Sequence, residues 1–229
     1  SGGLDSRLVA STLKHCGYDN VLCLWYGKPG NLESERSRFI ADTLGYTWIQ
    51  VPYSAGLWRK AIQSPGMRDY WVFSSNAVSI PHCDDWLAIR ELRENRAVSE
   101  DGILVPGHTG DFICGGHLKY VFDPLWQDDS EKFVDSLIKK HYSMWDHLVA
   151  CSNVRAVITR RLEEALGVLP KDADEDEEVA RKYELWEWQE RQAKFVVNSV
   201  RSYEFFGFSW RIPLWDQAVV EFWKRVPLI

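Results

Sequence analysis

The chain opens on the stretch Ser1-Gly2-Gly3-Leu4-Asp5-Ser6, and an amphipathic helix is predicted to follow directly, over residues 6–14. Two adjacent glycines let the backbone approach an anion closely and adopt a positive φ. The helix turns free N–H groups and the positive end of its dipole toward that anion. Ser1 and Ser6 add hydroxyl donors, whereas the Asp5 carboxylate would repel a phosphate unless a cation lies between them. This pattern predicts a phosphate-binding loop with a magnesium ion.

The same six residues also fit a purely structural role, in which Asp5 or Ser6 caps the helix after a tight turn. The segment has neither the G-x-x-x-x-G-K-[ST] spacing of a Walker loop nor the G-x-G-x-x-G pattern. Because short glycine motifs are common, both interpretations stay open on these residues alone.

Strand and helix patterns alternate downstream of the loop. Short apolar runs that end at Gly or Pro are typical of buried parallel strands, and they occur at residues 21–26, 47–51 and 102–105. Helical patterns lie at residues 31–44 and 84–96. Strands alternating with helices of this length form βαβ units with right-handed crossovers. We therefore predict an α/β fold, with a parallel sheet flanked by helices over residues 1–125 and a first strand preceding Ser1.

The remainder, residues 126–229, is predicted to be the mostly helical C-terminal part of the same domain. Helical periodicity occurs at residues 131–142, 146–166 and 179–206. The acidic run at residues 171–178 is typical of a solvated loop that leads into an acidic first helical turn.

Charge and composition exclude several classes of protein. The net charge of −6 and the pI near 5.6 indicate no broad attraction to nucleic acid or to an anionic membrane. No apolar run approaches the roughly 20 residues needed to span a bilayer, and no signal peptide is visible. The five cysteines form an odd set without a C-x-x-C pair, which favours a reducing compartment. We predict a cytoplasmic location, no membrane span and no nucleic-acid partner.

A second glycine-rich segment, Val105-Pro106-Gly107-His108-Thr109-Gly110-Asp111-Phe112-Ile113-Cys114-Gly115-Gly116, follows the third predicted strand. Ligands of open parallel sheets bind at the carboxyl edge of the strands, and Asp111 follows that edge. His108 is interpreted either as a satisfied loop histidine or as a catalytic residue.

A third segment, Gly207-Phe208-Ser209-Trp210-Arg211-Ile212-Pro213-Leu214-Trp215-Asp216, lies near the C-terminus. The guanidinium of Arg211 is a planar fork suited to a phosphate or a carboxylate. Pro213 stiffens the turn, and Asp216 is predicted to cap the next helix.

The opening loop resembles the pyrophosphatase loop of the N-type ATP-pyrophosphatase superfamily, whose members cleave ATP between the α and β phosphates. The second segment is similar to the asparagine-synthetase signature Ser-Gly-Glu-Gly-Ala-Asp-Glu-Leu-Phe-Gly-Gly; its matching residues are Gly107, Asp111, Gly115 and Gly116. The third is similar to Gly-Val-Glu-Ala-Arg-Val-Pro-Phe-Leu-Asp; its matching residues are Gly207, Arg211, Pro213 and Asp216. Since the three segments occur in the family's order, the chain resembles a divergent asparagine synthase.

The chain departs from these signatures at three positions. His108 and Phe112 replace acids, and Ser209 replaces a glutamate that the family associates with the acyl-adenylate step. Gly107-His108 with Asp111 is also similar to the tRNA-lysidine synthetases. The departures put the exact substrate in question.

The resemblance implies an adenine-nucleotide alpha-hydrolase-like core over residues 1–125 and an ATP-dependent ligase that forms C–N bonds, as in asparagine biosynthesis. A carboxylate would be activated as an acyl-adenylate with release of pyrophosphate, and ammonia or an amine would displace AMP. The implied catalytic residues are Asp5, Asp111 and Arg211, and Asp5 and Asp111 would bind Mg²⁺. The implied ATP-binding residues are Ser1, Gly2, Gly3, Leu4, Asp5, Ser6, Leu24, Pro106 and Gly107.

Three alternatives accompany this interpretation. An amidotransferase of this type would take nitrogen from a glutaminase domain outside this chain. A divergent relative would act on a sugar, a peptide or a secondary metabolite. A non-catalytic ATP-binding module would keep the loop and lose the chemistry.

Overall fold

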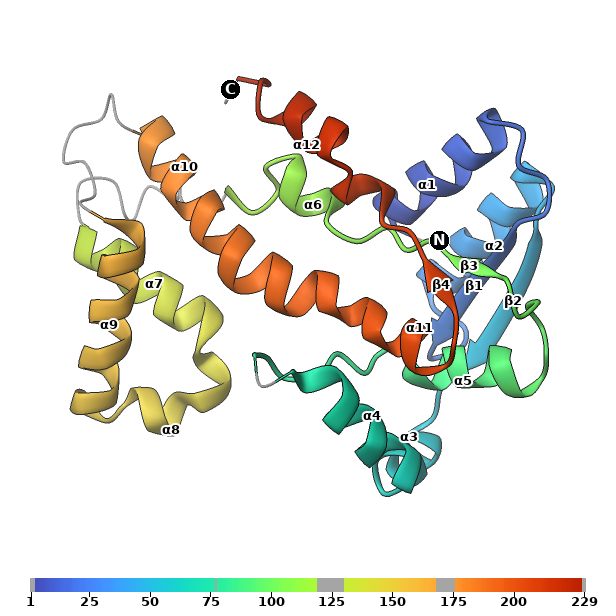
Figure 1. The fold of residues 1–229 in the computed structure, drawn as a ribbon, viewed down its shortest axis with the longest axis horizontal. Coiled ribbons are helices and arrows are strands. Elements are labelled where there is room, and N and C mark those ends of the chain that lie inside the picture. The colour runs from blue at the N-terminus through green and yellow to red at the C-terminus, as the bar shows by residue number, and fades with distance from the viewer. Residues whose placement is uncertain (1–2, 77, 119–129, 168–175, 228–229) are drawn as a thin grey trace. The chain divides into compact units, whose positions relative to one another are not determined.

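The computed structural model describes residues 3–76, 78–118, 130–167 and 176–227, and these form two compact units (Figure 1). Unit 1 comprises Ser1–Cys114 and Gln192–Val226, and unit 2 comprises Gly115–Arg191 and Pro227–Ile229. Of the predicted features, Ser1, Gly2 and residues 171–175 of the acidic run lie outside the described residues.

Unit 1 begins with the predicted alternation of helices and strands: α1 (Leu4–His15), β1 (Leu22–Gly27), α2 (Leu32–Leu44) and β2 (Thr47–Pro52). The strands β1 and β2 pair in parallel, from Leu22 opposite Thr47 to Gly27 opposite Pro52. Helix α2 packs against both strands, and α1 packs against α2 (Figure 1). These elements confirm the predictions made from local sequence patterns.

The ends of α2 show why the local sequence was informative. The backbone N–H of Ser34 donates to the Asn31 side-chain oxygen at 2.8 Å, which caps the first turn. Gly45 ends the helix with φ of 70°, a left-handed conformation that suits glycine. Between those caps, the buried Ile40 and Ala41 face the core.

Three further helices continue unit 1: α3 (Ala55–Ile62), α4 (Pro65–Ser75) and α5 (Trp86–Glu94). Only α5 was predicted from the sequence. The side chains of Ser54 and Ser64 cap α3 and α4 by accepting from Leu57 and Met67 backbone N–H groups. Together the three helices enclose a core cluster made of Ala61, Met67, Tyr70, Trp86 and Leu87.

The later part of unit 1 contains β3 (Ile103–Leu104), α6 (Gly110–Ile113), η5 (Val197–Val200), α11 (Arg201–Phe205), β4 (Ser209–Trp210), η6 (Pro213–Trp215) and α12 (Gln217–Trp223). β3 and β4 pair in parallel, and the Arg211 backbone N–H donates to the Leu104 carbonyl at 2.9 Å. Asp216 accepts from the Ala218 N–H at 2.9 Å, which confirms the predicted cap of α12.

The two compact units do not follow the predicted boundary between residues 125 and 126, because residues 192–226 return to unit 1. Residues 192–226 belong to unit 1 because β4 pairs with β3 and because Val200, Tyr203 and Phe208 share a core cluster with Ile89 and Leu92. The polar and aromatic pattern of residues 192–226 did not indicate this partner.

Unit 2 is helical, as predicted, and contains α7 (Ser130–His141), η2 (Ser143–Trp145), α8 (Asp146–Val149), α9 (Ser152–Leu166) and α10 (Asp176–Glu187). Its core includes Leu137, Leu162 and Tyr183. The helix predicted over residues 146–166 is interrupted, since α8 ends at Val149 and α9 begins at Ser152. The helix predicted over residues 179–206 changes its winding, because the π-helical η4 (Trp188–Val196) follows α10 and precedes η5.

The fold class is therefore α/β, with short parallel strand pairs flanked by helices. The more specific adenine-nucleotide alpha-hydrolase-like arrangement stays a prediction. Within the described ranges, no helix is long and apolar enough to cross a membrane.

Candidate active site

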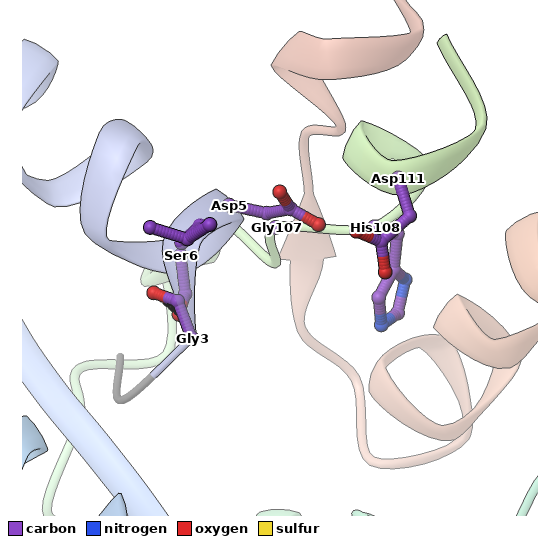
Figure 2. A pocket seen from close by; sticks show the side chains of 7 residues that line it. Gly3, Asp5, Ser6, Gly107, His108 and Asp111 are labelled. Carbon is purple, nitrogen blue, oxygen red and sulfur yellow. Dashed lines mark hydrogen bonds between the residues drawn. The ribbon is translucent and has the colours of Figure 1, made fainter. Parts of the chain in front are cut away.

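Unit 1 has an open pocket of about 340 Å³ between the start of α1 and the loop after β3 (Figure 2). It is lined by Gly3, Leu4, Asp5, Ser6, Gly107, His108 and Asp111. Two of the three sequence motifs thus meet at one place, although about 100 residues separate them in the chain.

The start of α1 has no side-chain cap in the described residues. Gly3 is the N-cap residue, with extended backbone at φ −81° and ψ 170°. Asp5 lies inside the first turn, and the Ser6 hydroxyl donates to the Gly3 carbonyl at 3.4 Å. Neither side chain caps the helix, so the geometry does not support the capping interpretation. Backbone N–H groups of a first turn that no side chain caps can bind an anion.

Glycine at position 107 is required by the close approach of the two segments. A Cβ atom at Gly107 would lie 2.5 Å from the Ser6 backbone nitrogen and 2.8 Å from the Asp5 carbonyl carbon. Backbone atoms of a packed helix cannot move aside as a flexible side chain does. Gly107 therefore lets the loop after β3 lie against the first turn of α1.

Gly110 has a comparable role that sequence reasoning missed. A Cβ atom at Gly110 would overlap the carboxyl group of Asp5. The Asp5 side chain therefore lies over the start of α6, which carries Asp111. The sequence shows a glycine at this position, but not that it contacts Asp5, which lies over 100 residues away in the chain.

The carboxylates of Asp5 and Asp111 face a common space. Figure 2 shows the Asp5 carboxylate directed from α1 toward Asp111. Burial raises the pKa of Asp5, and the negative charge of Asp111 raises it further, although the Asp111 backbone N–H donates to Asp5 and lowers it. A cation between the two carboxylates would relieve this repulsion.

The carboxylates of Asp5 and Asp111 suit Mg²⁺, which needs few ligands from the protein. In the described residues, no group of three or more His, Cys, Asp or Glu side chains could hold a metal ion. Mg²⁺ commonly binds through one or two carboxylates and completes its octahedron with water and substrate phosphates. Asp5 and Asp111 supply such a pair beside a helix N-terminus that favours phosphate.

His108 is held by a residue from the C-terminal part of unit 1. Its Nδ1 atom lies 3.0 Å from the Ser199 hydroxyl oxygen, and that hydroxyl donates to the Val196 carbonyl at 2.7 Å. Burial lowers the pKa of His108 to about 4, with a smaller contribution from His82, so the imidazole is neutral near pH 7. His108 is thus both hydrogen-bonded at one nitrogen and part of the pocket lining.

The other residues singled out from the sequence lie outside the lining set. Pro106 precedes Gly107 in the chain, and Leu24 packs against the core cluster that contains Ile89 and Leu92. Arg211 is exposed, and its guanidinium donates to the Trp210 carbonyl at 2.7 Å. The roles of these three residues toward ATP or substrate stay predictions.

The departures from the family signature have different environments. Phe112 is buried, and its ring centroid lies 6.1 Å from that of Trp215, so it serves packing. Ser209 is exposed on β4.

Comparison with known proteins agrees with the resemblance seen in the sequence. The sequence pattern of the family described as asparagine synthase matches residues 1–228. The chain therefore belongs to the asparagine synthase family, a family of ATP-dependent amide-forming ligases. No curated protein matches the chain.

Proposed function

We propose that this protein activates a small-molecule carboxylate with ATP, as an acyl-adenylate with release of pyrophosphate, and transfers the acyl group to ammonia or an amine. The observation that carries the proposal is the meeting of Asp5 and Asp111 beside the start of α1, which no described side chain caps. Two carboxylates beside a phosphate site repel the phosphate unless a cation lies between them.

The pocket residues have distinct roles in this reaction. Gly3 and the first turn of α1 would bind the pyrophosphate through backbone N–H groups, as would Ser1 and Gly2 before them. Asp5 and Asp111 would hold Mg²⁺, which when bound neutralises negative charge on the phosphates. Fixed donors of this kind stabilise charge that develops on the leaving group, and the pocket aligns the attacking carboxylate.

Three predicted contacts complete the proposal. Arg211 would bind an anionic group of ATP or substrate, because its guanidinium is exposed and has five N–H donors. Leu24 and Pro106 would contact the nucleotide.

A cytoplasmic location, a role in asparagine biosynthesis and nitrogen supply by a glutaminase domain are part of the same proposal.

The test is release of AMP and pyrophosphate by the purified chain with Mg-ATP, a panel of carboxylic acids, and ammonium or amines. We expect Asp5→Asn and Asp111→Asn each to reduce pyrophosphate release by about 100-fold or more, because each removes a charged ligand of the proposed Mg²⁺ ion. Asp42→Asn is the matched control, since Asp42 is exposed on α2 and forms an ion pair with Arg38 at 3.8 Å. Absence of AMP, of pyrophosphate and of Mg-ATP binding would refute the proposal.

A second candidate is a relative that uses the same activation chemistry on another acid. Its support is Ser209, which stands where the family signature has a glutamate associated with the acyl-adenylate step. Aspartate and larger sugar, peptide or secondary-metabolite acids in the same panel separate the two. Mg-ATP binding that Asp5→Ala abolishes, without turnover of any acid, would instead favour the non-catalytic module.

A further inference from the structure

Unit 2 contains a pocket of its own, with a volume of about 440 Å³. Residues of α7, α8 and α9 line it, and α9 packs against both α7 and α8 (Figure 1). Small-molecule sites are typically pockets of about 300–1,000 Å³, so the size suits a small ligand. Among the described residues, this pocket and the candidate active site share no lining residue.

The floor of the pocket is apolar. Ile138 is 2% exposed and belongs to the core cluster of unit 2, and Tyr142 and Val149 pack against that cluster. All three line the pocket, so it reaches from the surface to the hydrophobic core of unit 2. An apolar group that enters the pocket would leave water there, which favours binding.

Four charged side chains also line the pocket, and two of them neutralise each other. The Arg155 guanidinium donates a hydrogen bond to the Asp135 carboxylate. Lys139 and Asp146 are exposed, and neither forms an ion pair or a side-chain hydrogen bond with another described residue. The pocket therefore offers a ligand one ammonium group and one carboxylate group beside an apolar floor.

We propose that this pocket binds a free α-amino acid with an apolar side chain. The carboxylate of the ligand would pair with Lys139, its ammonium group would pair with Asp146, and its side chain would contact the floor at Ile138 and Val149. Charge-assisted hydrogen bonds of this kind are stronger than neutral ones. The site is separate from the function proposed for unit 1, and binding to it requires no nucleotide.

The charges of the pocket select against ligands that carry only one sign of charge. An anion without an ammonium group would pair with Lys139 and be repelled by Asp146, and a cation without a carboxylate would be repelled by Lys139. An uncharged apolar ligand would partly shield both side chains from water without pairing either of them. A zwitterion pairs both, and its apolar side chain uses the floor.

Exposed charges elsewhere in unit 2 have a different setting. Arg160 and Glu164 on α9 form an i,i+4 ion pair at 3.8 Å, and neither lines the pocket. They are the matched controls for Lys139 and Asp146, because they carry the same two signs of charge outside the pocket.

Isothermal titration calorimetry of the full chain with leucine, isoleucine and phenylalanine tests the site. We expect at least one of these amino acids to bind. Its N-acetyl derivative lacks the ammonium group, and its amide derivative lacks the carboxylate. Each derivative should bind about 10-fold more weakly, the effect of one lost charge-assisted hydrogen bond. Glycine, which has no apolar side chain, should also bind more weakly than the parent amino acid.

Two substitutions assign the partners of the ligand. Lys139→Gln should weaken binding of the parent amino acid about 10-fold and should not weaken binding of its amide, which has no carboxylate to pair. Asp146→Asn should weaken binding of the parent in the same way and should not weaken binding of the N-acetyl derivative. Arg160→Gln and Glu164→Gln should bind the parent as the wild type does. Thermal unfolding shows whether each variant is folded.

Absence of binding by all three amino acids at millimolar concentration would overturn the proposal. Equal affinity for the parent and its two derivatives would also overturn it, because the charges would then not select the ligand. Equal weakening of the parent and the amide by Lys139→Gln would do the same, because Lys139 would then act only on the structure of the pocket. None of these measurements uses ATP, so their failure is distinguishable from failure of the function proposed for unit 1.

Discussion

Gly107 is the residue at which the loop after β3 meets the first turn of α1. Because a Cβ atom there would lie 2.5 Å from the Ser6 nitrogen, we expect Gly107→Ala to push the two segments apart. Overpacking of this kind typically costs about 1–3 kcal/mol. If the bound state requires the close approach, Mg-ATP affinity should fall by the equivalent of that energy, roughly 5- to 150-fold. Isothermal titration calorimetry measures the change.

Gly56→Ala is the control for this prediction. A Cβ atom at Gly56, on α3, would have its nearest neighbour at 3.9 Å, the Ser54 hydroxyl, which is an ordinary contact. Its Mg-ATP affinity should equal that of wild type. Unchanged affinity in Gly107→Ala would contradict the idea that the pocket depends on the close approach of the two segments.

Asp85 gives unit 1 a pH-dependent stability. The residue is only 2% exposed, and burial raises its pKa to about 6, although His82 and the Ser202 and Tyr203 hydroxyls lower it. A carboxyl group with a raised pKa binds more protons in the folded state than in the unfolded one. Its contribution to stability is therefore present below pH 4 and is lost as pH rises to about 6, by roughly 3 kcal/mol at most.

Asp85→Asn isolates this contribution because an amide does not titrate. We expect the free energy of unfolding of Asp85→Asn, relative to wild type, to increase between pH 4 and pH 6.5 and then to level off. Urea unfolding across this range measures it, and other titrating groups cancel in the difference. A relative stability independent of pH would show that Asp85 ionises as readily in the folded chain as in the unfolded one.

Among the elements, α12 depends on its cap. Asp216 accepts from the Ala218 N–H at 2.9 Å, and loss of such a cap typically costs about 1 kcal/mol. We expect Asp216→Ala to lower the unfolding temperature of unit 1. Asp216→Ser should lower it less, because serine also caps helices. Differential scanning calorimetry tests this prediction, and equal temperatures for the two variants would contradict it.

Local signals explain which elements the sequence predicted. Asn31 and Gly45 bound α2 at both ends, and the apolar runs of β1 and β2 precede a glycine or end at a proline. The caps of α3 and α4, Ser54 and Ser64, were also local, and a systematic search for serine caps would have found them. β4 is different: its two residues become a strand only by pairing with β3.

At the scale of the whole molecule, the two units have separate cores. Leu162 is 2% exposed in the core of unit 2, whereas every residue that lines the pocket belongs to unit 1. We expect Leu162→Ala to destabilise unit 2 by about 2–5 kcal/mol through cavity formation. Calorimetry at a temperature below unfolding should give wild-type affinity for Mg-ATP, and a large loss there would show that the pocket depends on the unit 2 core.

The sequence by itself determined the α/β class, the first two helices and strands, the helical character of unit 2 and the membership of the family. These depend on periodicity, caps and motif spacing, which are local. Only the tertiary structure shows that the Asp5 side chain lies against Gly110 and that His108 contacts Ser199, 91 residues away. The physical reason is that close approach and hydrogen-bond direction are set by packing between distant segments. The opening loop could therefore be proposed as a phosphate site from the sequence, whereas its approach to Gly107 and the contact of His108 with Ser199 could not.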